Sequence, residues 1–206
     1  MSIVRRAGSV DFLGSFPGAL PPGTVPEVAF VGRSNVGKSS AVNAVLGSRR
    51  VARVSRRPGR TQAINLFLVN RGVIFADLPG YGYARVPDEV REQWRGLVDG
   101  YLRNRDTLRA VVLLVDARHN AQPIDQQLLS YMADTGWNCL VLATKVDRLG
   151  KAARKPALAR LANELGLNLT LKGTIEEGDL VPFSAVSREG VDRVWDWLDQ
   201  KRAASV

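Results

Sequence analysis

The chain has 206 residues, which is enough for one domain with a substantial hydrophobic core. Its hydrophobic content of 45% and charged content of 24% are typical of a globular protein, and a single cysteine excludes a disulfide framework. Lys and Arg total 29 against 20 Asp and Glu, so the net charge of +9 favours a polyanionic partner such as nucleic acid. No stretch resembles a transmembrane span or a secretory signal, and we therefore expect a cytoplasmic location.

In chain order, an arm rich in proline and glycine is predicted over residues 1–26, because these residues disfavour a long helix or a central strand. A single domain is predicted over 27–203, with a short tail over 204–206. Apolar runs within this domain predict strands over Glu27–Val31, Ile64–Val69, Val73–Ala76, Arg109–Val115, Asn138–Ala143 and Leu180–Phe183. Helical periodicity predicts helices over Ser39–Leu46, from about Pro87 through Tyr101, and over Gln122–Thr135, Lys151–Leu165 and Val191–Lys201.

Alternation of strands and helices predicts a three-layer α/β fold around a mostly parallel sheet. The turn residues Asn70-Arg71-Gly72 join two predicted strands into a hairpin, so one antiparallel strand is expected in that sheet.

The most informative motif follows the first predicted strand. It reads Gly-Arg-Ser-Asn-Val-Gly-Lys-Ser over residues 32–39, between an apolar run and a helix-like run. A glycine-bounded loop in this setting predicts a phosphate-binding P-loop, in which backbone N–H groups and the helix N-terminus face an anion. In this interpretation Lys38 reaches the outer phosphates and the Ser39 hydroxyl is a Mg²⁺ ligand.

Other polar residues follow predicted strands, at the edge of a parallel sheet where ligands bind. Asp77 ends the hairpin, where a carboxylate can hold Mg²⁺ through water. Gly80 offers an unhindered N–H near the terminal phosphate, and Thr61 is a candidate for a second hydroxyl on the metal. We therefore predict a metal site made by Ser39, Thr61 and Asp77.

The choice of base is predicted by Thr144-Lys145-Val146-Asp147, which ends a later strand. A carboxylate at Asp147 can accept two hydrogen bonds from guanine N1–H and its 2-amino group, a donor pair that adenine lacks. The Lys145 stem can lie along the base. Ser184-Ala185 can present a backbone N–H to the guanine carbonyl.

The segment from Ser48 to Thr61 has no helical or strand period and contains no acidic residue. We interpret it as a mobile basic loop that binds RNA phosphates. A solvated loop without a partner is the alternative, and Arg57 or Arg60 acting on the phosphates as an arginine finger is another. Its arginines are Arg49, Arg50, Arg53, Arg56, Arg57 and Arg60.

Taken together and in this order, these motifs resemble those of the Ras-like P-loop GTPases. Gly-Arg-Ser-Asn-Val-Gly-Lys-Ser-Ser, Pro-Gly-Arg-Thr-Gln, Asp-Leu-Pro-Gly-Tyr-Gly-Tyr-Ala and Thr-Lys-Val-Asp are similar to the EngB/YsxC family of ribosome-biogenesis GTP-binding proteins, over about residues 27–198. The resemblance implies GTP or GDP with Mg²⁺ as ligands, a monomer, and a role in assembling the large ribosomal subunit through rRNA, with a link to cell division and septation. The usual guanine motif begins with Asn, so Thr144 implies weaker nucleotide affinity.

The nucleotide-binding residues that we predict from the motifs and the resemblance are Gly32, Arg33, Ser34, Asn35, Val36, Gly37, Lys38, Ser39, Ser40, Gly59, Arg60, Thr61, Gln62, Ala63, Asp77, Leu78, Pro79, Gly80, Thr144, Lys145, Val146, Asp147, Phe183, Ser184 and Ala185.

Hydrolysis is expected to be slow, because Tyr81 stands where Ras has a Gln that orients water. The predicted catalytic residues are Lys38, Asn35, Thr61 and Gly80. Related GTPases with Asn at the position of Asn35 are activated by K⁺, so this residue is a candidate K⁺ ligand, and ribosomal particles are a second candidate stimulus. Two other functions stay open: a hydrolytically inert RNA-binding module regulated by guanine nucleotides, and an ATP-dependent P-loop kinase.

Overall fold

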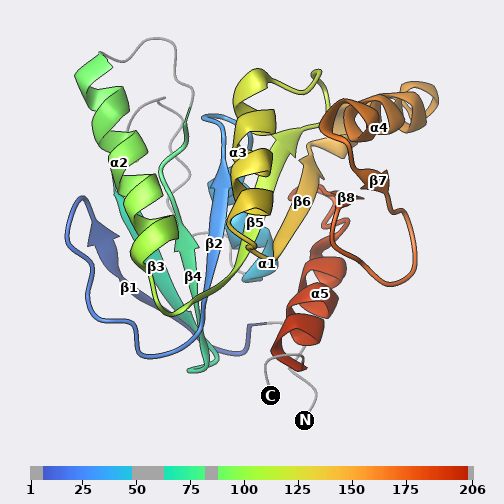
Figure 1. The fold of residues 1–206 in the computed structure, drawn as a ribbon. Coiled ribbons are helices and arrows are strands. Elements are labelled where there is room, and N and C mark those ends of the chain that lie inside the picture. The colour runs from blue at the N-terminus through green and yellow to red at the C-terminus, as the bar shows by residue number, and fades with distance from the viewer. Residues whose placement is uncertain (1–6, 48–62, 82–87, 204–206) are drawn as a thin grey trace.

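The computed structural model of the chain describes residues 7–47, 63–81 and 88–203, with side chains described from 96 to 201 in the last range (Figure 1). Within these residues the strands form one eight-stranded sheet in the order β1-β3-β4-β2-β5-β6-β8-β7. The strands are β1 (Val10–Phe16), β2 (Glu27–Gly32), β3 (Ile64–Val69), β4 (Val73–Asp77), β5 (Leu108–Asp116), β6 (Cys139–Thr144), β7 (Asn168–Leu169) and β8 (Asp179–Pro182). The helices are α1 (Lys38–Val45), α2 (Asp88–Asn104), α3 (Pro123–Asp134), α4 (Lys151–Leu165) and α5 (Val191–Ala203), with a short 3₁₀ helix over Val146–Arg148.

The predicted three-layer α/β fold with a mostly parallel sheet is confirmed. Strand β3 pairs antiparallel with both β1 and β4, and the remaining described pairings are parallel, so β3 runs against the other described strands. The hairpin of β3 and β4 turns through Asn70 and Arg71, whose φ angles of 50° and 52° suit a tight hairpin turn.

The helices form two layers because the central strands are apolar on both faces. Along β5, alternate side chains enter different clusters: Val112 and Leu114 pack with α1 and α5, whereas Val111 and Leu113 pack with α2, α3 and α4. Figure 1 shows α2 and α3 in front of the sheet and α1 behind it. No helix in the described part of the chain is long and apolar enough to cross a membrane.

The arm predicted over residues 1–26 contains a strand that the sequence analysis did not foresee. Strand β1 joins the sheet at its edge, from Val10 beside Val69 to Phe16 beside Ile64. Its register shifts between Phe12 and Gly14, and Gly14 has a φ angle of 144°. An edge strand tolerates such a bulge because its outer side has no partner strand. The separation of the chain at residue 26 into an arm and a domain stays a prediction.

The N-terminal end of β2 holds a buried polar cluster around Glu27, whose side chain is 0% exposed. Arg105 donates from Nη2 to Glu27 Oε1 at 2.7 Å, Thr107 Oγ1 donates to the same oxygen at 2.8 Å, and the Tyr101 hydroxyl donates to Oε2. Arg105 also donates from Nη1 to the Pro21 carbonyl at 2.7 Å. The cluster therefore ties the N-terminal segment to β2, α2 and the start of β5.

Candidate functional site

The segment between β2 and α1 has the backbone of a tight anion-binding loop. Gly37 precedes the helix with a φ angle of 101°, a conformation that side chains disfavour. A Cβ on Gly32 would lie 2.8 Å from the Leu114 carbonyl oxygen, so this last residue of β2 has to be a glycine. Asn35 is exposed at the tip of the loop, with a φ of 64°. The loop thus brings the N-terminus of α1 and Lys38 to the carboxyl ends of β2 and β5.

Lys38, Ser39 and Asp77 meet in one cluster, in which Lys38 and Asp77 are buried and Ser39 is partly buried. Strand β4 lies parallel beside β2 with Asp77 opposite Phe30, which places the carboxylate next to the loop. Lys38 Nζ forms an ion pair with Asp77 Oδ1, and Ser39 Oγ donates to Oδ2 at 2.8 Å. The Lys38 and Asp77 side chains are 7% and 1% exposed. A hydroxyl and a carboxylate side by side are the hard oxygen donors that Mg²⁺ prefers.

These donors fit a metal that is completed by phosphate and water oxygens rather than by protein alone. Among the described residues no group of three or more His, Cys, Asp or Glu could by itself hold an ion. The third predicted metal ligand, Thr61, lies outside the described residues.

The residues after β4 pack directly against the loop. Ser34 N–H donates to the Tyr81 carbonyl at 2.8 Å, and Tyr81 N–H donates back to the Gly32 carbonyl at 3.3 Å. A Cβ on Gly80 would lie 3.0 Å from Ser34 Cα, so a glycine permits this close approach. Leu78 and Pro79, also predicted to bind nucleotide, are buried between β4 and this contact.

The Tyr81 side chain is directed to α3. Its hydroxyl lies 3.3 Å from Asp125 Oδ1, and Asp125 Oδ2 accepts the Gln122 N–H at 3.2 Å. Burial, and then the nearby Asp125, raise the pKa of Tyr81 above its usual value. Burial also raises the pKa of Asp125. The tyrosine is therefore a neutral hydrogen-bond donor that joins the segment after β4 to the first turn of α3.

At the end of β6, Thr144 and Lys145 are bonded to the loop. The buried Thr144 hydroxyl lies 2.8 Å from the Val36 carbonyl oxygen and 3.0 Å from that of Val115. Lys145 Nζ donates to the Asn35 carbonyl and, at 2.8 Å, to Asp116 Oδ2. Both side chains thus connect the predicted base-recognition motif to the predicted phosphate loop.

Asp116 at the end of β5 was missed by the sequence analysis. Burial raises the pKa of Asp116, but hydrogen bonds from Arg118 and Lys145 outweigh this effect and lower the pKa to about 2. Arg118 Nη2 lies 2.7 Å from Asp116 Oδ2. The rule that found Asp77, a carboxylate at the end of a buried strand, applies equally to Asp116 and could have found it.

Asp147 is held in place by the segment after β8. Ser184 Oγ donates to Asp147 Oδ1 at 2.6 Å and accepts the N–H groups of Val186 and Ser187. Arg148 Nε lies 3.4 Å from Asp147 Oδ2. The single hydroxyl proton of Ser184 is used in the hydrogen bond to Asp147, and this bond fixes one carboxylate oxygen.

One of the two predicted backbone donors at Ser184-Ala185 already has a partner within the chain. The Ser184 N–H donates to the Glu189 carbonyl at 3.0 Å, so it is already used. Of this pair, the Ala185 N–H is the remaining candidate for a guanine carbonyl. Phe183, which is also predicted to bind nucleotide, is fully buried and donates its N–H to the Ala143 carbonyl at 2.8 Å.

The predicted residues are therefore brought together from β2, α1, β4, β6 and β8. Val146 is buried, whereas Arg33 and Ser40 are partly buried. Ala63 is partly buried in a bend just before β3. The predicted site residues that lie outside the described residues are Gly59, Arg60, Thr61 and Gln62, and the same holds for the loop arginines Arg49, Arg50, Arg53, Arg56 and Arg57.

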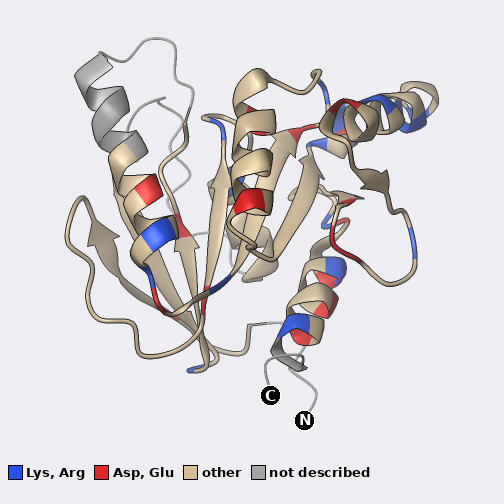
Figure 2. Ribbon diagram, in the orientation of Figure 1, with Lys and Arg blue, Asp and Glu red and all other residues tan. Residues whose placement is uncertain are grey.

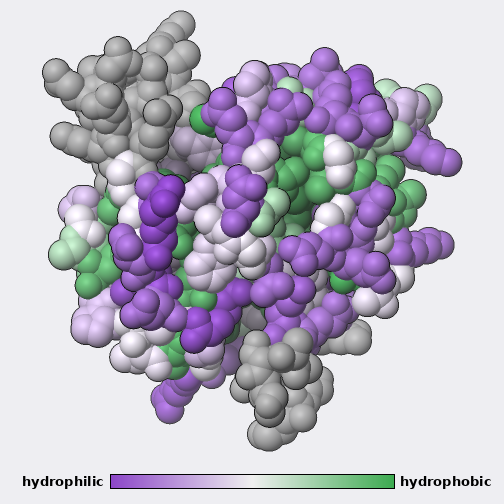
Figure 3. All heavy atoms as spheres, in the orientation of Figure 1, coloured by the Kyte–Doolittle hydropathy of each residue, from purple (hydrophilic) through white to green (hydrophobic). Residues whose placement is uncertain are grey.

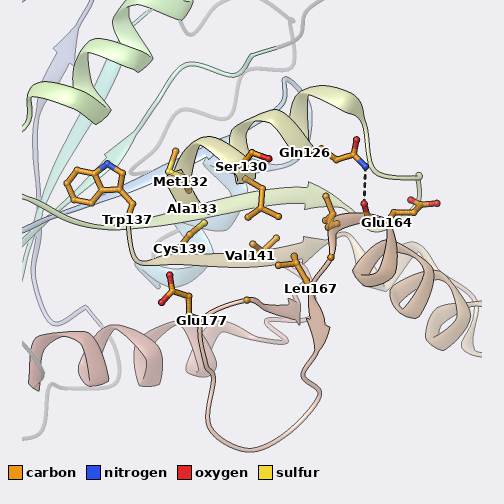
Figure 4. Close-up of a pocket in the computed structure, with 14 residues that line it drawn as sticks. Gln126, Ser130, Met132, Ala133, Trp137, Cys139, Val141, Glu164, Leu167 and Glu177 are labelled. Carbon is orange, nitrogen blue, oxygen red and sulfur yellow. Dashed lines mark hydrogen bonds between the residues drawn. The ribbon is translucent and has the colours of Figure 1, made fainter. Parts of the chain in front are cut away.

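A separate cavity of ≈ 520 Å³ lies between α3, β6 and the C-terminal end of α4 (Figure 4). Met132, Cys139 and Val141 form an apolar floor, and Figure 3 shows hydrophobic side chains in the hollow between α3 and α4. Burial raises the pKa of Cys139 to about 12, which leaves it an unreactive thiol. None of the predicted nucleotide-binding residues lines this cavity, so it is distinct from the candidate site.

Comparisons with known proteins agree with this geometry. A family model described as 50S ribosome-binding GTPase matches residues 27–145. A probable GTP-binding protein EngB of Anaeromyxobacter dehalogenans is 45% identical over 204 residues, which cover 95% of this chain and 91% of that protein.

Two solved structures share the fold. The crystal structure of a probable GTP-binding protein EngB has a TM-score of 0.66 at 23% identity, and the match covers 85% of this chain and 97% of that one. Aquifex aeolicus Era, a Y63A variant bound to GDP and AlF₄⁻, has a TM-score of 0.67 at 22% identity, covering 87% of this chain and 57% of Era.

Proposed function

Because the chain belongs to the EngB family of GTP-binding GTPases, we propose that it is a slow, Mg²⁺-dependent GTPase that switches between GTP and GDP states during assembly of the large ribosomal subunit. One observation carries the proposal: Lys38 and Ser39 at the start of α1 converge on the buried carboxylate of Asp77 at the end of β4. Phosphoryl transfer depends on positioning and charge stabilisation, which such a cluster can provide.

In this proposal each group of the loop has a defined task. Lys38 leaves Asp77 to neutralise the outer phosphates, and the N–H groups at the start of α1 bind phosphate oxygens. Ser39 and Asp77 hold Mg²⁺, which neutralises charge on the phosphates when bound. Gly80 contributes an N–H near the terminal phosphate because its lack of a side chain allows close approach to Ser34.

Guanine recognition is assigned to Asp147. Its carboxylate accepts the two donors of guanine, and its orientation is supported by the 2.6 Å bond from Ser184. Lys145 crosses above the loop, since a Cβ on Gly37 would lie 3.7 Å from Lys145 Cε. Its stem can therefore cover the base while its ammonium group holds the Asn35 carbonyl.

Thr144 partly replaces the missing Asn of the usual motif. An Asn has one acceptor and two donors, whereas Thr144 offers one donor, which it gives to the loop. We propose that the bond from Thr144 to the Val36 carbonyl keeps the loop in place. The second hydrogen bond that an Asn could donate is missing, so nucleotide binds more weakly.

Slow hydrolysis is proposed because Tyr81 has no side-chain amide that could orient the attacking water. Its hydroxyl is instead bonded to Asp125. Asn35 is exposed at the tip of the loop and is proposed as a K⁺ ligand near the phosphates. Initial rates of GTP hydrolysis in KCl and in NaCl at equal ionic strength test this role. Faster hydrolysis in KCl that disappears in Asn35→Ala is expected, and equal rates would refute it.

The ribosomal part of the proposal has the family and the net charge of +9 as its support. Thr61 and the arginines of residues 49–60, which lie outside the described residues, are proposed to couple GTP to rRNA binding in the cytoplasm. The family-implied role in septation would follow indirectly from ribosome supply. Co-sedimentation with ribosomal particles in GTP, in GDP and without nucleotide tests the switch, and binding indifferent to all three conditions would contradict it.

Two further assays separate this function from the alternatives. A single-turnover assay with labelled GTP should yield GDP and phosphate. If no hydrolysis occurs either with or without ribosomal particles, the chain is a hydrolytically inert guanine-nucleotide-binding module. ATP should not displace a fluorescent GDP analogue, whereas efficient displacement would indicate a kinase instead.

A further inference from the structure

A smaller pocket of ≈ 350 Å³ lies between the N-terminal turns of α4 and the start of α5. We call it the basic pocket, because its charged lining consists of four cations and one acid. Its apolar lining residues are Leu158, Leu171 and Pro182. None of these residues belongs to the nucleotide site described above. The charged lining residues are Lys151, Arg154, Lys155, Arg193 and Glu189.

Acids balance only part of the positive charge of this region, through the ion pairs of Arg148 with Asp147, Arg154 with Glu189 and Arg160 with Glu164. Residues 148–163 include five Lys and Arg and no Asp or Glu. Figure 2 shows Lys and Arg distributed along α4. Lys151 and Lys155 are exposed, and within the described residues no ion pair involves either of them. They are four residues apart, so both project from the same side of the helix.

The two arginines are held as fixed walls of the pocket. Arg154 forms an ion pair with Glu189, and Arg193 donates from Nη1 to the Thr170 carbonyl and from Nη2 to the Gly173 carbonyl at 3.3 Å. Carbonyl partners orient the Arg193 guanidinium without neutralising its charge. The pocket therefore combines preorganised cations with two lysines that can move onto a ligand.

We propose that the basic pocket binds the phosphate backbone of RNA. Unpaired lysines beside fixed arginines suit closely spaced phosphates, and binding would release the counterions around them. The exposed Leu171, which lines the pocket, can contact a ribose or a base. An anionic lipid surface fits less well, because the solvent side of α4 carries Ala152, Ala153 and Ala159, which are too small to insert.

This inference rests on the proposed ribosomal function for the choice of RNA among polyanions. It places an RNA contact on α4, apart from the predicted basic loop of residues 49–60, so the chain would hold RNA at two places. The pocket begins only a few residues after Asp147, and RNA bound there would lie near the guanine end of the nucleotide site.

The test compares two double variants that remove the same charge. Lys151→Gln with Lys155→Gln alters the pocket, whereas Arg109→Gln with Arg160→Gln alters exposed arginines elsewhere. Arg160 follows Lys151 by nine residues, which places it on about the opposite side of α4. Both doubles should bind GDP and hydrolyse GTP like the wild type, because none of these residues contacts the nucleotide site.

Binding is measured by the fluorescence anisotropy of a labelled large-subunit rRNA fragment over a series of salt concentrations. We expect roughly tenfold weaker binding for the pocket double near physiological salt, with a logarithmic salt slope smaller by about 1.5. The control double should bind within about twofold of the wild type.

Equal weakening by both doubles would refute the pocket as a specific contact, as would unchanged binding by the pocket double. Binding of the wild type to phosphatidylserine vesicles but not to RNA would refute it in favour of a membrane. A wild-type chain that binds this RNA through the pocket but never hydrolyses GTP would overturn the proposed function and leave the inference standing.

Discussion

Two buried carboxylates, Glu27 and Asp77, lie at opposite ends of the neighbouring parallel strands β2 and β4. Each pairs with a cation, which is the partly buried Arg105 for Glu27 and the buried Lys38 for Asp77. Glu27 receives bonds on both oxygens from groups that have no part in the nucleotide site. The partners of Asp77 are instead Lys38 and Ser39, both of which a phosphate and its metal would also bind.

The difference separates a permanent connection from an exchangeable one. The Glu27 cluster joins four segments, and removing Arg105 would leave the buried Glu27 carboxylate without a cation. Asp77 holds the Lys38 ammonium group in place, but a bound phosphate would compete with Asp77 for this cation. We therefore expect a similar pair of charges to serve stability at one end of the sheet and nucleotide binding at the other.

The largest expected effect is on stability, from Glu27→Ala. The substitution leaves the partly buried Arg105 guanidinium without its acid and should lower the free energy of unfolding by about 3–5 kcal/mol. For a chain of this size, thermal denaturation should show a loss of about 10 °C. The same variant should keep wild-type GDP affinity below its melting temperature. The matched Glu27→Gln variant should lose less, because its amide oxygen still accepts hydrogen bonds; an equal loss would indicate a packing effect.

The second effect sharpens the contrast at the other end of the sheet. Asp77→Asn weakens the hold on Lys38, so GDP without Mg²⁺ should bind about tenfold tighter than to the wild type, which corresponds to about 1.4 kcal/mol. The ligand-induced rise in melting temperature should increase accordingly. Titration of Mg²⁺ should show a weaker metal effect in this variant. If GDP binds no tighter, Lys38 is not exchanged between Asp77 and phosphate.

A smaller effect is expected from Thr144→Val, which is nearly isosteric but lacks the hydroxyl. It removes the donor to the Val36 carbonyl and should cost about 1 kcal/mol, or about fivefold in GDP affinity. Isothermal titration with GDP measures this loss. Thr144→Ser retains the hydroxyl and should bind almost normally, whereas equal losses in both variants would point to the methyl group.

The last effect is a pH dependence of stability from Asp116, which appears only in acid. Its pKa in the folded chain is about 2, below the unfolded value of about 4. A lowered folded-state pKa contributes stability above the unfolded value, and this contribution is lost as the pH falls from about 4 to 2. Asp116→Asn should therefore be less stable than the wild type at neutral pH, with the difference vanishing near pH 2. Denaturant unfolding across this range tests the prediction, and a difference independent of pH would contradict it.

Local sequence by itself determined the fold class and most elements. Some patterns act over only a few residues and can be recognised from local sequence. Examples are the apolar run of β5, the turn at Asn70 and Arg71, and the glycines of the loop between β2 and α1. Asp77 and Asp147 were found because the ends of parallel strands meet at one edge of a sheet. The position of these carboxylates at strand ends is therefore what turned local patterns into the prediction of one site.

Only the tertiary structure decided which side chains share a contact. Lys145 meets the Asn35 carbonyl across 110 positions of sequence, and Arg105 meets Glu27 across 78. Segment β1 is a strand because β3 offers it a partner at the edge of the sheet. Its own glycine and the nearby prolines by themselves favour irregular structure. The basic pocket likewise exists only where α4 meets α5. Such contacts depend on packing between distant segments, whose geometry no local period encodes.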